Sequence, residues 1–95
     1  MEKGNETLTL FDLEMMFNQA KVMDANYIGV KIRMQGFDKP ETIINPNENF
    51  DEKLVYYKKA YNEDLTLKAF NGIEIVGFEY GNSFQEIQDW LMDNK

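Results

Sequence analysis

The segment at residues 83–94, SFQEIQDWLMDN, carries three carboxylates at regular spacing and no basic residue. Glu86, Asp89 and Asp93 are three and four residues apart, so a helix would present them within about 60° of one another. Their steps along the helix axis would be about 4.5 and 6 Å, comparable with the spacing of phosphates along a nucleic-acid strand. Such a face predicts attraction to a basic surface. The same pattern also suits a solvated face that serves only solubility.

Carboxylates can also do acid–base or metal chemistry, but the chain lacks the groups that usually assist them. It contains no histidine and no cysteine, so no imidazole base, thiolate nucleophile or nitrogen or sulfur metal ligand is present. Ser83 is the only serine, and Glu86 three residues later indicates a helix cap rather than a nucleophile. Residues 24–35 imitate a calcium loop, but Ile28 and Gln35 stand where oxygen ligands are required. We therefore expect no enzymatic activity, no cofactor and no metal site.

The charge of the whole chain is strongly one-sided. Seventeen acidic residues against ten basic ones give a net charge of −7, and residues 69–94 contain no basic residue. This balance argues against direct binding to nucleic acid or to an anionic membrane, because phosphate binding needs clustered lysine and arginine. The expected partner is instead a protein with a basic surface, and Trp90 on the flank of the last helix could anchor the contact. The candidate partner-binding residues are Glu74, Glu79, Glu86, Asp89, Trp90 and Asp93.

Hydrophobic periodicity and capping signals predict the elements that carry these residues. Helices are expected at residues 10–23, 50–61 and from 84 onward, and strands at 27–34, 42–45 and 73–80. Residues 65–70 alternate weakly before Asn71-Gly72, which favours one more hairpin strand, and a helix running on through Leu67 is the alternative. The order is α-β-β-α-β-β-α. It predicts one α+β domain over residues 1–95, with a loose start at 1–8 and a small antiparallel sheet of three to four strands covered by helices mainly on one face.

The first helix is apolar on two sides. Leu10, Leu13 and Phe17 belong to one face, which should enter the core. A second, narrower stripe of Phe11, Met15 and Val22 lies well round from it. Because a clustered apolar patch is rarely left bare, this stripe predicts a homodimer contact or a docking site. The alternative is that the neighbouring strand or the N-terminal segment wraps over it.

Several blocks of the chain resemble a known group of proteins. They are YIGVKI, PETIINPNENF, KLVYYKKAY, GIEIVGF and SFQEI, which together span most of residues 27–91. On these blocks the chain resembles small uncharacterised proteins encoded in phages and prophages of Gram-positive bacteria. The resemblance implies a context, that of a dispensable early or accessory phage gene, and it implies no activity.

These observations lead to two functional hypotheses. The first is a phage-encoded, non-enzymatic module that blocks a basic site on a host defence or nucleic-acid-handling protein by charge mimicry; anti-CRISPR inhibitors fit the size, acidity and context. The second is a small structural or assembly module that dimerises or docks through Phe11, Met15 and Val22. The N-terminal residues lack the basic start and apolar core of a signal peptide, so a cytoplasmic location in the bacterial host is expected.

Overall fold

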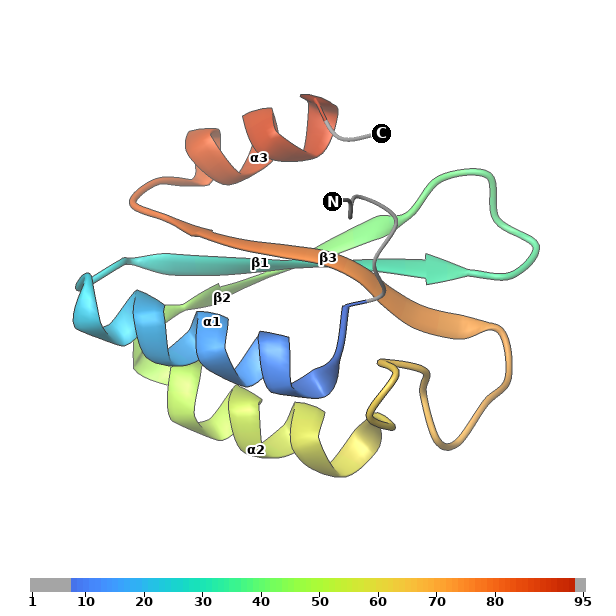
Figure 1. Ribbon diagram of the computed structural model, residues 1–95. Helices are drawn as coiled ribbons and strands as arrows, with labels where there is room; N and C mark the ends of the chain where they lie inside the picture. The colour runs from blue at the N-terminus through green and yellow to red at the C-terminus, as the bar shows by residue number, and fades with distance from the viewer. Residues whose placement is uncertain (1–7, 94–95) are drawn as a thin grey trace, which may run out of the picture.

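The central strand β1, Tyr27–Met34, is paired on both sides, and the fold is built around it. The computed structural model describes residues 8–93 of the backbone and residues 8–89 of the side chains. Strands β2 (Glu41–Pro46) and β3 (Ile73–Gly81) flank β1 in the order β2-β1-β3, and both pairings are antiparallel. Figure 1 shows two layers of helix around this sheet. Helices α1 (Leu10–Val22) and α2 (Phe50–Ala60) cover one face, and α3 (Phe84–Asp93) covers part of the other.

The sheet register decides which side chains face each layer. Ile28, Val30 and Ile32 point from β1 into the core with α1 and α2, so the alternate residues of β1 face the α3 side. The pairing of β1 with β3 shifts by one residue after Lys31, because Lys31 pairs with Gly77 whereas Ile32 pairs with Ile75. The extra residue is Val76. Val76, beside Gly77, is therefore a β-bulge in β3.

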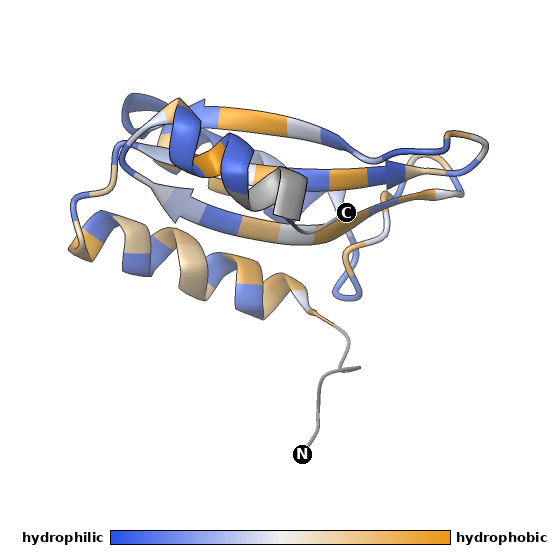
Figure 2. Cartoon of the chain, turned by 90° about the horizontal axis from the view of Figure 1, so that it is seen from above, coloured by the Kyte–Doolittle hydropathy of each residue, from blue (hydrophilic) through white to orange (hydrophobic). Residues whose placement is uncertain are grey.

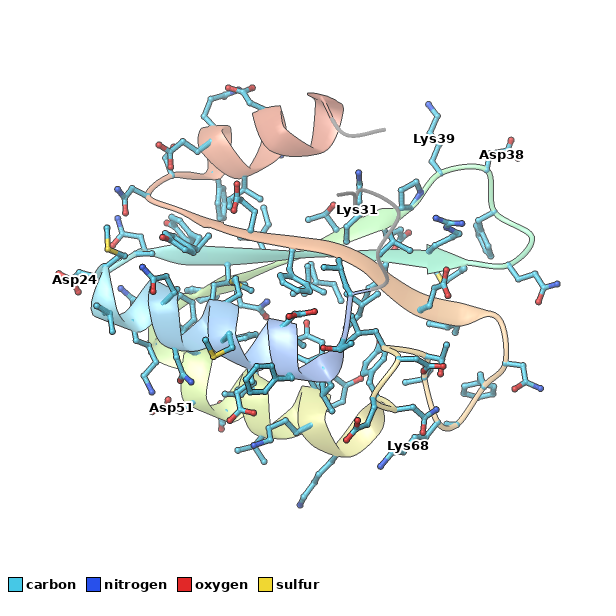
Figure 3. The ribbon with its side chains drawn as sticks, in the orientation of Figure 1. Asp24, Lys31, Asp38, Lys39, Asp51 and Lys68 are labelled. Atoms are coloured by element: carbon cyan, nitrogen blue, oxygen red, sulfur yellow. The ribbon has the colours of Figure 1, made fainter. Side chains whose placement is uncertain are left out.

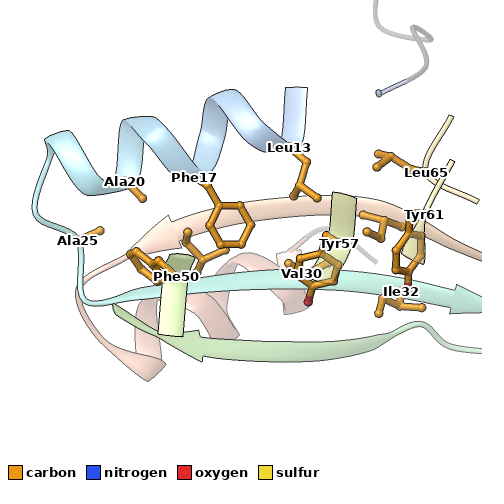
Figure 4. Packing of buried hydrophobic residues seen from close by; sticks show 12 residues of the cluster. Leu13, Phe17, Ala20, Ala25, Val30, Ile32, Phe50, Tyr57, Tyr61 and Leu65 are labelled. Atoms are coloured by element: carbon orange, nitrogen blue, oxygen red, sulfur yellow. The ribbon is translucent and has the colours of Figure 1, made fainter. Parts of the chain in front are cut away.

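Helices α1 and α2 run antiparallel and enclose the core against the sheet. A capping box of Thr9 and Asp12 starts α1. Phe17 meets the Phe50 ring edge-on and lies beside the Tyr57 ring, with centroids 5.9 and 6.1 Å apart. Figure 4 shows these aromatic rings between α1 and the strands. Across the outer surface of the layer, Lys21 pairs with Asp51 and Lys58 with Glu14.

The prediction for residues 65–70 was wrong in both of its forms. Neither a strand nor a helix forms there, and the element order within the described residues is α-β-β-α-β-α with a short 3-10 turn, η1 (Asn47–Asn49), before α2. Leu65 is fully buried with a φ of 70°, in the left-handed region, and it makes backbone hydrogen bonds to Asn62 and Ile75. Burial of this one side chain therefore outweighs the weak alternation of the segment. Thr66 forms an isolated bridge with Glu74 of β3, and Leu67 forms one with Tyr61.

Helices α1 and α2 share one face of the sheet, which agrees with the expectation of helices mainly on one face, and α3 packs on the other face. Asn49 precedes α2, but its side chain makes no capping hydrogen bond, because η1 leads directly into the helix. The loose start expected at residues 1–8 lies outside the described residues, except for Leu8.

Candidate functional site

Helix α3 is held against the sheet at two glycines. Ile87, on the inner side of α3, is fully buried. A Cβ placed on Gly29 would lie 2.6 Å from Cγ2 of Ile87, and one placed on Gly81 would lie 2.7 Å from Oε1 of Glu86. At Gly29 this distance is far inside van der Waals contact, so Ile87 reaches β1 because residue 29 has no side chain. At Gly81 the nearest atom is the end of the flexible Glu86 side chain, and Cδ1 of Ile87 lies 3.3 Å away, so the fit there is tight. Figure 2, viewed from above, shows α3 crossing over the strands.

The start of α3 uses the first of the predicted acidic residues. The Glu86 backbone N–H donates to the Ser83 hydroxyl at 3.2 Å, and the Glu86 carboxylate accepts from the backbone N–H of Asn82 at 2.6 Å. The predicted cap is thus present, although the reciprocal bond goes to Asn82 instead of Ser83. Beside it, the ring of Phe84 lies 4.8 Å from the ring of Tyr27 on β1. Glu86 is exposed, but its carboxylate has a structural task.

The other candidate acids whose side chains are described, Glu74, Glu79 and Asp89, lie on the same side of the sheet as α3. Asp89 is exposed on α3 and accepts a hydrogen bond from Gln85, one turn earlier, at 2.9 Å. Glu79 stands opposite Gly29 in the β1–β3 register, so its side chain projects from the face that α3 covers in part. Glu74 follows the same face farther along β3, opposite Arg33. Trp90 and Asp93 belong to α3, but their side chains lie outside the described residues.

Two cations border these acids, and no prediction from the sequence placed them there. Lys31 and Arg33 come from β1, far from residues 69–94 in sequence, and alternate residues of the strand place both on the α3 side. Figure 3 shows Lys31 rising from the sheet toward that side. Lys31 is only 6% exposed, whereas Arg33 is exposed and pairs in register with Glu74. The antiparallel pairing of β1 and β3, together with the alternation of YIGVKIRM, was the signal that would have revealed them.

We define the acidic face as the described carboxylates Glu74, Glu79, Glu86 and Asp89. The structure brings all four to one side of the sheet. They do not contribute equally to the negative charge of this face, because Arg33 stands opposite Glu74 and the Glu86 carboxylate caps its own helix. Glu79 and Asp89 are the members whose exposed carboxylates have neither constraint.

The apolar stripe of α1 behaves as its spacing predicts. Leu13, Phe17 and Ala20 are fully buried, and the other side of the helix is open. There Phe11 is 67% exposed, Met15 53% and Val22 79%. Hydrophobic colours recur along α1 in Figure 2. The stripe therefore lies outside the core, where a partner can reach it.

A shallow hollow of about 240 Å³ lies at the end of the sheet away from the glycines that seat α3. It brings together one cation, one carboxylate and a few neutral polar groups, without a nucleophile or an imidazole. Within the described chain, no group of histidine, cysteine or acidic residues is arranged to hold a metal ion. The hollow is lined by Arg33, Gln35, Thr66, Gly72, Ile73 and Glu74.

The resolved pKa shifts belong to the core and to the turn after α2. Burial raises the pKa of Tyr57 to about 12, an effect that the neighbouring Asn45 side chain partly offsets. The Tyr57 hydroxyl is buried without a hydrogen bond of good geometry, while the Asn45 amide donates to the Ile28 carbonyl at 3.3 Å. Burial also raises the pKa of Tyr61, and hydrogen bonds from Thr66 lower the pKa of Asp64. These shifts follow from packing and turn geometry.

Comparison of the chain with protein-family models, curated proteins and solved structures finds no match in any of the three. In the part of the chain that the structure describes, no helix has the length and apolar character needed to cross a membrane.

Proposed function

We propose that this protein is a phage-encoded, non-enzymatic binding module whose acidic face occupies a basic site on a host protein that handles nucleic acid. The observation that carries the proposal is the gathering of Glu79, Glu86 and Asp89 on the α3 side of the sheet, all three from the segment 69–94, which contains no basic residue. Charges arranged in this way attract a cationic groove over several ångströms and repel nucleic acid.

The way α3 is mounted supports this role. A decoy surface must hold its charges in place before binding, because ordering them on contact would cost free energy. Ile87 anchors α3 against Gly29, where a side chain would collide with it, and the cap at Ser83 fixes where the helix begins. Gln85 then holds the Asp89 carboxylate at one position on the outer side.

The centre of the proposed contact is Glu79 with Asp89. Glu74 contributes less, because the positive charge of Arg33 lies across the strand pair and offsets it. Lys31 is nearly buried, so its charge is presented to a partner less directly than those of the exposed acids. Blockade would follow from occupancy alone: a partner whose cationic groove is filled by carboxylates cannot bind phosphates there. An anti-CRISPR inhibitor would act in this way.

The experiment is capture from a bacterial lysate on immobilised protein, followed by identification and a competition assay with the captured protein. The proposal expects a retained protein with a basic nucleic-acid site, which loses labelled DNA or RNA as the acidic module is added. A retained protein that binds its nucleic acid equally well in the presence of saturating module would contradict the proposal.

A further inference from the structure

The outer stripe of α1 has the spacing of a helix-pairing seam. Phe11, Met15 and Val22 lie within about 40° of one another at 100° per residue, on the side opposite Leu13 and Ala20. Asn18, also exposed, completes the series 11, 15, 18, 22. Its intervals of four, three and four residues are those of the contact positions of a coiled-coil helix, and one polar residue in such a seam typically selects the register.

The charges around this seam favour a second copy of the chain over a basic partner. The helical layer carries four acids, Asp12, Glu14, Asp51 and Glu52, and four bases, Lys21, Lys53, Lys58 and Lys59. Four minus four leaves this layer neutral, although the whole chain carries −7. Two copies that meet here therefore avoid the net repulsion that their other surfaces would create, and a strongly cationic partner gains nothing from a neutral layer.

The order of the charges selects one relative orientation. Along α2 the acids Asp51 and Glu52 come first and the bases Lys58 and Lys59 last. An antiparallel pair places the acidic end of each helix beside the basic end of its counterpart, whereas a parallel pair would set like charges side by side. Along α1 the order is the same, with Asp12 before Lys21.

We propose that two copies of this chain pair through α1 in antiparallel orientation about a two-fold axis. The axis passes between Met15 and Asn18, the middle of the seam, so that Phe11 of each copy packs beside Val22 of the other. Glu52 and Lys59 on the exposed side of α2 then complement one another between the copies. This inference is independent of the acidic face, which lies on the other side of the sheet.

The size of the seam sets the strength of the contact. Helix α1 has 13 residues and is about 20 Å long, so a single helix pair buries less than the roughly 800 Å² per partner of a standard stable interface. The dimer should therefore be weak, with a dissociation constant on the order of tens of micromolar. It should form reversibly as the concentration rises.

Sedimentation velocity over a concentration series tests the seam. The wild type should shift from monomer to dimer below about 1 mM, and Phe11→Ser and Met15→Glu should each raise the dissociation constant at least about tenfold. Phe70→Ser is the matched control, because Phe70 is 66% exposed, as Phe11 is, but lies in the loop before β3. A wild type that stays monomeric would overturn the proposal. So would a Phe70→Ser variant that raises the dissociation constant of the dimer as much as Phe11→Ser does.

Disulfide trapping tests the orientation, since the chain has no natural cysteine. In the antiparallel pair, the two Val22 positions are about 16 Å apart, too far to be bridged, whereas Val22 and Phe11 of the other copy are neighbours. Val22→Cys alone should therefore remain uncrosslinked under mild oxidation, and its mixture with Phe11→Cys should give the heterodimer. Rapid crosslinking of Val22→Cys with itself would refute the antiparallel arrangement. Neither result bears on the acidic face, so the two proposals fail separately.

Discussion

Replacing Gly29 by alanine should loosen α3 from the sheet. The new Cβ would lie 2.6 Å from Cγ2 of Ile87, about 1 Å inside ordinary carbon contact, and 3.7 Å from Cγ2 of Thr42, which is comfortable. Only the Ile87 contact must therefore yield. Overpacking of this kind costs typically 1–3 kcal/mol, and the gain of about 0.5–1 kcal/mol from replacing a strand glycine offsets part of it. The expected net loss of unfolding free energy is about 1–2 kcal/mol.

The sign of this effect should reverse when Ile87 is shortened. Ile87→Ala removes Cγ2 and alone should cost about 2–5 kcal/mol, because a fully buried side chain is lost. In that background Gly29→Ala meets no obstacle and should stabilise the protein by about 0.5–1 kcal/mol. The two substitutions should thus be coupled by about 1.5–3 kcal/mol.

Urea unfolding followed by circular dichroism of the wild type, both single variants and the double variant measures this coupling. Additive effects, within about 0.5 kcal/mol, would refute the reasoning, because they would mean that Gly29 and Ile87 are not in contact. The assignment of the acidic face would then fail as well, since it depends on α3 lying over Gly29.

Three other substitutions separate structural from surface roles. Tyr57→Phe should leave stability at pH 7 unchanged or raise it by up to about 1 kcal/mol, because the hydroxyl is buried without a partner. The pKa of Tyr57 is about 12 in the folded protein against an ordinary 10, so the folded state keeps its proton longer. This difference in pKa stabilises the folded state by about 2–3 kcal/mol below pH 10, and the stabilisation is lost as the pH rises from 10 to 12. Chemical denaturation across this range should therefore show a smaller loss of unfolding free energy for Tyr57→Phe than for the wild type. On α3, Glu86→Ala should lower the unfolding free energy by about 0.5–2 kcal/mol through loss of the cap, whereas Asp89→Ala should change it by less than about 0.5 kcal/mol; equal effects in thermal melts would contradict the capping role of Glu86.

Local signals were sufficient for most of the fold. The α+β class, the cap at Ser83, the strand Tyr27–Met34 and the final helix were predicted correctly, because each depends on residues close together in sequence. The structure of residues 65–70 was not predicted, because Leu65 adopts a left-handed backbone that buries its side chain in the core. The core residues that it contacts are distant in sequence, so no local pattern indicates this conformation. The position of α3 on the opposite face likewise depends on Gly29, which is 58 residues before Ile87 in the chain.

The candidate site was predicted less completely than the fold. The spacing of Glu86 and Asp89 correctly indicated one exposed helix, but it could not show that Glu86 is occupied by the Asn82 N–H. Counting charges along the chain suggested a surface without cations. Strand pairing brings Lys31 and Arg33 to its border, because neighbours in a sheet come from distant parts of the sequence.

If the acidic face attracts a basic partner, the rate of association with the captured protein should depend on the charges of that face. The double variant Glu79→Lys/Asp89→Lys is compared with Glu48→Lys/Glu63→Lys, which changes the net charge equally at exposed positions in η1 and in the turn after α2. The association rate of the wild type should fall steeply as the salt concentration rises, because exposed charges are screened within about 8–10 Å at physiological ionic strength. The first variant should associate at least about tenfold more slowly, while the control should stay within about threefold of wild type. Equal slowing in both folded variants, or a rate that salt does not change, would contradict this role of the acidic face.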